Sequence, residues 1–149
     1  MLANSLQKYL DDKHVPYTTI SHQPTYTAQE IAAKAHISGR TLAKTVMVKL
    51  DGKMVMAVVP AAYHVNFQLL KEATGSTNIE LAREDEFVDL FPDVDVGAMP
   101  PFGNLYGLDV YVAESLAEDE MIAFSAGTHT DLIKMPFGIF AKLVKNRSN

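Results

Sequence analysis

The sequence contains no cysteine among its 149 residues. This absence excludes a disulfide framework, catalysis by a thiolate and any zinc site with sulfur ligands. No stretch approaches the roughly 18 apolar residues that a membrane-spanning helix requires. Residues 1–14 carry charged side chains among scattered apolar ones, so they lack the apolar centre of a secretory signal peptide. We therefore expect a cytoplasmic protein without a membrane partner.

Basic residues are in the minority, with 13 Lys and Arg against 18 Asp and Glu and a formal net charge of −5. A protein that binds nucleic acid broadly neutralises many phosphates and is usually basic. The charge therefore argues against binding along a duplex. It remains compatible with contact to the end of a nucleic acid only, or with contact assisted by a partner protein.

The sequence also lacks the common motifs of cofactor and hydrolase chemistry. It has no G-x-x-x-x-G-K-[ST] phosphate loop, no G-x-G-x-x-G fingerprint and no G-x-S-x-G nucleophile elbow. The histidines, at positions 14, 22, 36, 64 and 129, never form H-x-H, H-x-x-H or H-x-x-x-H. We expect no cofactor and no metal, although a metal site assembled from distant segments stays open.

The composition, 48% hydrophobic and 21% charged, is typical of a globular protein, and we expect one domain over residues 1–149. Apolar residues at helical spacing in residues 2–10 predict a first helix. Thr27 and Glu30 form a capping box that predicts a second helix, ending before Gly39.

Two β-rich runs, residues 45–50 and 53–59, flank Asp51 and Gly52, a pair that favours a type I′ hairpin turn. The mixture of strands and helices predicts an α+β fold with a curved mixed β-sheet or a partly closed barrel surrounded by helices. The other expected elements are a strand over 17–21, a helix over 67–73 between Asn66 and Gly75, strands over 78–82, 109–113, 121–125 and 130–135, a short acidic helix over 84–90 and a helix over 137–144.

Three positions are candidates for function. Lys44 can hold a phosphate or carboxylate with its ammonium group, or be a solvated lysine at a strand end. Gly97 opens a glycine- and proline-rich loop whose backbone amides could bind a developing oxyanion, or which simply connects two elements. His129 could orient a carbonyl group or a water molecule, or be structural.

A second set of residues, Tyr26, Met47, Met99 and Phe102, could line an apolar pocket. Residues of these types are more often ordinary core. Position along the sequence does not distinguish the two roles.

Three segments in order, Lys44-Thr-Val-Met-Val48, Gly97-x-x-Pro-Pro-Phe-Gly103 and Gly127-Thr-His129, resemble the YbaK/ProX family of aminoacyl-tRNA deacylases. That family includes the editing domain inserted in bacterial prolyl-tRNA synthetases. The resemblance extends over about residues 17–144. It implies a compact domain that hydrolyses the ester between a wrongly attached amino acid and tRNA, and so serves translation fidelity.

The resemblance also implies roles for individual residues. Lys44 would hold the phosphate or ribose end of the terminal adenosine, Gly97 would position the aminoacyl carbonyl, and His129 would shape or polarise the site. The implied partners are the 3′ end of a mischarged tRNA and, in addition, an aminoacyl-tRNA synthetase. The residues implied to contact substrate are Tyr26, Met47, Met99, Pro100, Pro101, Phe102, Gly127 and Thr128.

Two other functions remain open. The acidic charge and the lack of an obvious nucleophile are compatible with a non-catalytic module that binds tRNA or a synthetase. A hydrolase of another small acyl ester is the third alternative.

Overall fold

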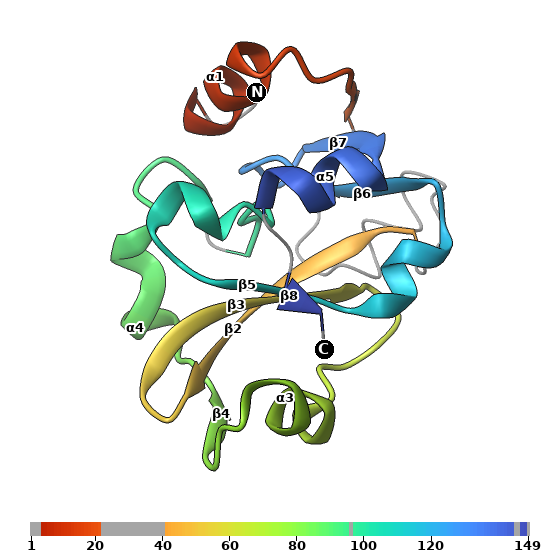
Figure 1. Ribbon diagram of the computed structural model, residues 1–149. Helices are drawn as coiled ribbons and strands as arrows, with labels where there is room; N and C mark the ends of the chain where they lie inside the picture. The colour runs from red at the N-terminus through yellow and green to blue at the C-terminus, as the bar shows by residue number, and fades with distance from the viewer. Residues whose placement is uncertain (1–3, 22–40, 96, 145–146, 149) are drawn as a thin grey trace.

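The computed structural model describes residues 4–21, 41–95, 97–144 and 147–148. Its elements are arranged in layers (Figure 1). Helix α1 lies at one end beside β7, β6 and α5, a second sheet crosses the middle, and α3 lies at the opposite end. The elements are α1 Asn4–Asp12, β1 Thr18–Ser21, β2 Ala43–Leu50, β3 Lys53–Pro60, α3 Phe67–Thr74, β4 Ile79–Leu81, α4 Glu84–Phe87, η1 Val88–Leu90, η2 Gly103–Tyr106, β5 Val110–Val112, η3 Glu114–Glu118, β6 Met121–Ser125, β7 Asp131–Pro136, α5 Phe137–Val144 and β8 Arg147–Ser148.

The strands form two sheets, which confirms the predicted α+β fold with a mixed sheet. One sheet has the antiparallel order β1-β7-β6, and the other has the order β4-β2-β3-β5-β8. In the larger sheet β4, β2 and β3 are antiparallel, whereas β5 pairs in parallel with β3 and with β8. A parallel bridge between Leu42 and Ala123 joins the two sheets at one point. The described strands do not close into a barrel.

The β2–β3 hairpin turns as its sequence predicts. Asp51 and Gly52 have φ angles of 50° and 87°, the positive values that a type I′ turn needs at both central positions. The Asp51 side chain also accepts hydrogen bonds from the backbone N–H groups of Thr77 and Asn78, at 3.2 and 2.7 Å. The turn is thereby fixed to the residues that lead into β4.

The larger sheet is buried on both faces because its strands alternate between two hydrophobic clusters. Met47 of β2 faces the main core, which lies between the two sheets and includes α5. Val48, the next residue, faces a smaller cluster that includes Leu70 of α3. The centre of the main core is an aromatic group in which the ring centroid of Phe102 is 5.5 Å from that of Phe124 and 5.4 Å from that of Phe140.

Helix α3 begins and ends at the predicted caps. Asn66 Oδ1 accepts a hydrogen bond from Leu69 N at 3.0 Å, and Gly75 ends the helix with φ 73°. The predicted helix between Thr27 and Gly39 lies outside the described residues. Three described elements, η2, η3 and β8, were not predicted. Among the described helices, none is long and apolar enough to cross a membrane.

Candidate functional site

A small hollow lies where the three predicted functional segments approach one another. Its volume is about 40 Å³, and it is bordered by Lys44 at the start of β2, by Gly97 and Met99 of the turn, and by Ser125 at the end of β6. Leu42, Ala43 and Thr45 complete its lining. The segment that carries His129 follows β6 directly. Strand β2 and the connection between β6 and β7 therefore bring distant parts of the sequence to one place.

Backbone hydrogen bonds hold the Gly97 turn against the segment after β6. Asp95 N donates to Gly127 O at 2.8 Å, and Gly127 N donates to Ala98 O at 3.0 Å. Within the turn, Ala98 N donates to Asp95 O at 3.0 Å. The N–H groups of Asp95, Ala98 and Gly127 thus already donate hydrogen bonds within the protein. Fewer backbone N–H groups of this loop therefore remain to bind a substrate.

Gly97 itself is in the left-handed region, with φ 86°. A β-carbon at this position would lie 3.5 Å from Cε1 of His129. Glycine therefore serves the turn, which requires a positive φ, whereas the distance to the imidazole would be an ordinary van der Waals contact. This contact brings two of the three predicted catalytic residues together.

A buried carboxylate organises the turn that presents His129. Asp131 is 6% exposed, and its Oδ2 accepts hydrogen bonds from the hydroxyl groups of Thr128 at 2.8 Å and Thr130 at 3.2 Å. Its Oδ1 accepts from Ser21 Oγ of β1 at 3.4 Å. The residues on both sides of His129 are fixed through one carboxylate. Asp131 was not among the predicted site residues, although the Thr-x-Thr-Asp pattern, with two hydroxyl groups beside an acid, was an available signal.

Lys44 stands at a junction between two hollows. By strand alternation it shares a face with Val46, on the side of the sheet that α3 covers, and both residues line a second hollow of about 280 Å³. Burial lowers the pKa of Lys44 below its ordinary 10.5 because the ammonium loses solvation. Within the described residues, no carboxylate lies within ion-pair distance of Lys44.

Lys49, on the same strand, has the opposite environment. Its Nζ lies 2.7 Å from Glu86 Oε1 and 3.2 Å from Glu80 Oε1. The hydrogen bonds to Glu86 and then to Glu80 raise the pKa of Lys49. One lysine of β2 is therefore already neutralised, whereas Lys44 can neutralise the charge of a ligand.

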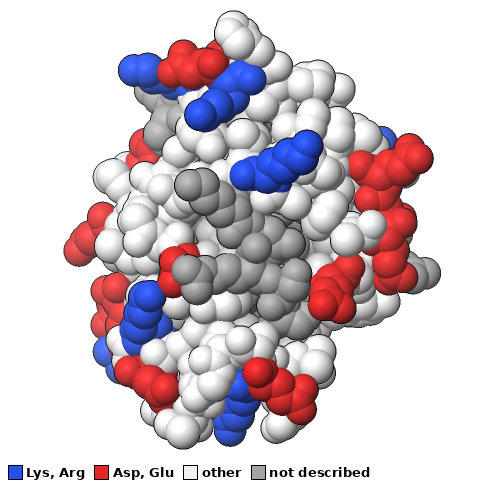
Figure 2. Space-filling view, in the orientation of Figure 1, with Lys and Arg blue, Asp and Glu red and all other residues white. Residues whose placement is uncertain are grey.

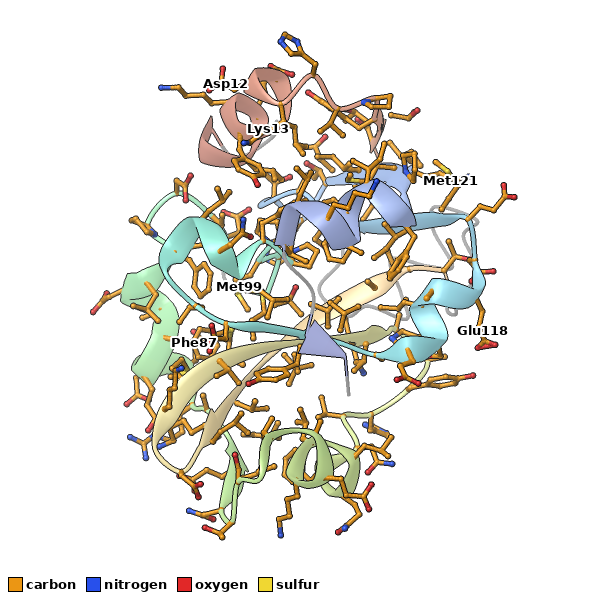
Figure 3. All side chains as sticks on the ribbon, in the orientation of Figure 1. Asp12, Lys13, Phe87, Met99, Glu118 and Met121 are labelled. Atoms are coloured by element: carbon orange, nitrogen blue, oxygen red, sulfur yellow. The ribbon has the colours of Figure 1, made fainter. Side chains whose placement is uncertain are left out.

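The other residues predicted to contact substrate divide into several groups. Met99 is 8% exposed and lines the small hollow. It also lies beside Phe87, and Figure 3 labels both residues. Met47 and Phe102 lie in the main core, at 3% and 0% exposure, and do not line the hollow.

Two neighbouring pairs, Pro100 with Pro101 and Gly127 with Thr128, do not line the small hollow. Pro100 and Pro101 follow Met99 in the sequence, and both are buried. The backbone of Gly127 and the hydroxyl of Thr128 are used in the internal hydrogen bonds described above. Tyr26 lies outside the described residues. No three His, Asp or Glu side chains of the described part of the chain are grouped as metal ligands.

Comparison with known proteins gives one family. The model of the aminoacyl-tRNA editing domain matches residues 22–142. The proline–tRNA ligase of Staphylococcus saprophyticus is 33% identical over 106 residues, which cover 70% of this chain and 18% of that ligase. The proline–tRNA ligase of Staphylococcus aureus is 36% identical over 85 residues, covering 57% of this chain and 14% of the ligase. The chain thus spans less than a fifth of the length of these relatives.

Solved structures show the same fold at low sequence identity. A hypothetical protein superposes with a TM-score of 0.86 at 20% identity, covering 97% of both chains. A candidate trans-editing enzyme for prolyl-tRNA synthetase superposes with a TM-score of 0.83 at 18% identity, covering 99% of this chain and 94% of the other. At these identities the likeness concerns the fold alone.

Proposed function

Because the chain belongs to the aminoacyl-tRNA editing domain family, we propose that it hydrolyses the ester that joins a wrongly attached amino acid to tRNA. The observation that carries this proposal is that Lys44 and the Gly97 turn border one hollow, with His129 next to Gly97. The substrate is the 3′ end of a mischarged tRNA. A synthetase is a further partner of this proposal, because the curated relatives are ligases that contain a matching segment.

The proposed reaction needs no protein nucleophile. A water oxygen attacks the aminoacyl carbonyl carbon, the ester bond breaks, and the departing ribose oxygen takes a proton, which releases amino acid and tRNA. An aminoacyl ester is already activated, so positioning and electrostatic stabilisation supply much of the acceleration. The ribose hydroxyl next to the ester can assist the water.

The two hollows at Lys44 divide the substrate between them in this proposal. The small hollow beside Gly97 and Met99 receives the amino acid side chain. The larger hollow on the α3 face receives the terminal nucleotide, whose phosphate or ribose end contacts Lys44. His129, in contact with the Gly97 turn, shapes the space around the carbonyl.

The size of the small hollow supports a substrate with a small side chain. Its volume is about 40 Å³, well below the roughly 300–1,000 Å³ typical of sites that hold drug-sized ligands. Alanine and serine are the natural first candidates, with cysteine and threonine as larger comparisons. An added methylene changes binding in an apolar pocket by only about 1–3 kcal/mol, so we expect graded rather than absolute discrimination.

The direct test is release of amino acid from tRNAs charged with Ala, Ser, Cys or Thr, with wild type, Lys44→Ala and Lys49→Ala compared. We expect selective hydrolysis by wild type, loss of hydrolysis in Lys44→Ala, and activity close to wild type in Lys49→Ala. The second variant is a matched control because it removes a lysine of the same strand whose charge is already paired.

Failure of folded wild type to release any amino acid, with a synthetase present, would reject the enzymatic proposal. If tRNA binding persists in that case and depends on Lys44, the chain is a binding module. Hydrolysis of free amino acid esters without hydrolysis of charged tRNA would instead favour a small-ester hydrolase.

A further inference from the structure

A hollow of about 320 Å³ lies outside the small hollow at Gly97, where the loop after β3 and the start of α3 approach η3. Tyr63 and Leu69 line it, and these large side chains are 44% and 45% exposed. Glu114 and Ser115, at the start of η3, add polar groups to its wall. Its volume is within the range of about 300–1,000 Å³ typical of sites for small organic groups.

This hollow adjoins the proposed nucleotide site, because one residue lines both. His64 lines both it and the hollow of about 280 Å³ on the α3 face. Lys44 lines that second hollow as well as the small one beside Gly97. A ligand with one end at Lys44 would reach Tyr63 by spanning these two adjoining hollows.

The chemistry of the hollow selects a flat, uncharged ring. The exposed Tyr63 ring and the Leu69 side chain offer an aromatic and an aliphatic surface for stacking. The Glu114 carboxylate only accepts hydrogen bonds when ionised, so it favours a ring with an amino group and repels a phosphate. In Figure 2, acidic side chains gather on the right of the view. Figure 1 draws η3 on that side, and Figure 3 labels Glu118, the last residue of η3, there. Because the acidic side chains near η3 repel phosphate, the phosphate groups of a bound ligand should lie near Lys44.

We propose that the Tyr63 hollow binds the base of the penultimate cytidine of the tRNA 3′ end, with Tyr63 stacking on the base and Glu114 accepting from its exocyclic amino group. The terminal adenosine occupies the neighbouring hollow between His64 and Lys44. This subsite rests on the proposed function, because it assigns the second nucleotide of the same substrate. Stacking on an aromatic ring is a general means of binding unpaired bases.

The test uses a microhelix RNA with a single-stranded CCA end that carries alanine through a non-hydrolysable 3′-amide. Its dissociation constant is measured for wild type, Tyr63→Ala, Tyr63→Phe and Leu90→Ala. We expect Tyr63→Ala to weaken binding roughly 5- to 100-fold, as for other bases stacked on aromatic side chains. Tyr63→Phe retains the ring and should bind within about twofold of wild type. Leu90 is also exposed, at 38%, but does not line the hollow, so Leu90→Ala should bind as wild type does.

A change in the RNA identifies which nucleotide is bound. With an abasic penultimate position, the effect of Tyr63→Ala should disappear. Replacing the penultimate cytidine by uridine, which lacks the amino group, should weaken wild type but not Glu114→Ala.

Three results would overturn the subsite. Full binding by Tyr63→Ala, while Lys44→Ala fails to bind, rejects the subsite and leaves the proposed function intact. If Tyr63→Ala weakens binding equally for RNA with and without the penultimate base, some other group of the ligand lies in the hollow. If free cytidine monophosphate binds as tightly as the microhelix, and this binding does not depend on Lys44, the hollow is a site for free nucleotides. Absence of both binding and hydrolysis in wild type rejects the proposed function itself.

Discussion

Gly97 and His129 are neighbours, and a methyl group on the glycine would stand 3.5 Å from Cε1 of the imidazole. These residues come from different segments, and backbone hydrogen bonds between Asp95, Ala98 and Gly127 keep the segments together. The contact is ordinary in distance, but the φ of 86° at Gly97 is unfavourable for any residue with a β-carbon. We therefore expect a substitution at either residue to shift the position of the other.

Gly97→Ala should lower the rate of amino acid release more than it lowers stability. The strained φ costs about 1–2 kcal/mol, and relief of that strain moves the turn against His129. We expect the midpoint of chemical denaturation to fall moderately and deacylation of alanyl-tRNA to fall at least tenfold. Single-turnover assays and urea unfolding of the same preparation measure the two effects.

Gly107→Ala is the matched control for this substitution. Gly107 also has a positive φ, 74°, and no atom lies within 4 Å of its would-be β-carbon. Its alanine variant should lose similar stability and keep its rate of hydrolysis. Equal loss of activity in both variants would show that backbone strain anywhere in the domain, rather than the contact with His129, controls the rate.

The lowered pKa of Lys44 predicts that ligand affinity falls at alkaline pH. Burial disfavours the charged ammonium, so the proton leaves below the ordinary value of 10.5. Above the lowered pKa, affinity for the amide-linked alanyl microhelix should fall by up to about tenfold per pH unit, because only the charged form binds the anion. Fluorescence anisotropy between pH 7 and pH 10 measures this dependence.

Lys44→Arg separates the lysine from other groups that titrate in the same range. A guanidinium stays charged throughout, so the variant should show weaker but nearly pH-independent binding. A wild-type profile that persists in Lys44→Arg would assign the alkaline loss to another group. Circular dichroism at each pH checks that the fold is retained.

Met99→Ala should widen the range of amino acids accepted. Removing this side chain enlarges a hollow of about 40 Å³, and it should destabilise the protein by about 2–5 kcal/mol because Met99 is also part of the core. The ratio of kcat/KM for threonyl-tRNA to that for alanyl-tRNA should rise roughly tenfold or more.

Met47→Ala provides the comparison for Met99→Ala. Met47 is 3% exposed in the same core but does not line the hollow. We expect a similar loss of stability with an unchanged preference between the two charged tRNAs. If both variants relax the preference equally, loosening of the core rather than the size of the hollow determines specificity.

Asp51 should contribute to stability in a pH-dependent manner. Its hydrogen bonds from the backbone of Asn78 and then from Thr77 lower its pKa below the ordinary 3.8. This stabilisation is fully present above pH 3.8 and is lost as the pH falls through the lowered value in the folded state. Asp51→Asn keeps a residue that tolerates φ 50°, so the turn should persist. The difference in unfolding free energy between wild type and Asp51→Asn should be clear at pH 7 and shrink below pH 3.5; a difference independent of pH would contradict the assignment.

The elements that the sequence predicted well carry their signals locally. Asp51 and Gly52 require the turn between β2 and β3, and Asn66 and Gly75 mark the ends of α3 through their own hydrogen bonds and φ angle. Strand β8 was missed because its two residues pair only with β5, a contact between distant positions. Short elements of this kind have no periodicity to reveal them.

The site was predicted less completely than the fold. Lys44 and Met47 lie on one strand at a separation of three, so strand alternation puts their side chains on opposite faces of the sheet, and Met47 faces the main core. That rule separates the two residues but does not tell from the sequence which of them faces the core. The role of Asp131 could not be read in this way, because its burial depends on pairing of β7 with β1.

The sequence separation of the contacts predicts an order in which these segments fold. The β2–β3 hairpin joins neighbours and can form early, whereas the Gly97 turn needs the segment after β6, and the Asp131 network needs β1 from the other end of the described chain. A nascent or partly folded chain can therefore possess its hairpin and Lys44 while lacking any organised pocket. Hydrolytic competence would appear last, as a signal that folding is complete.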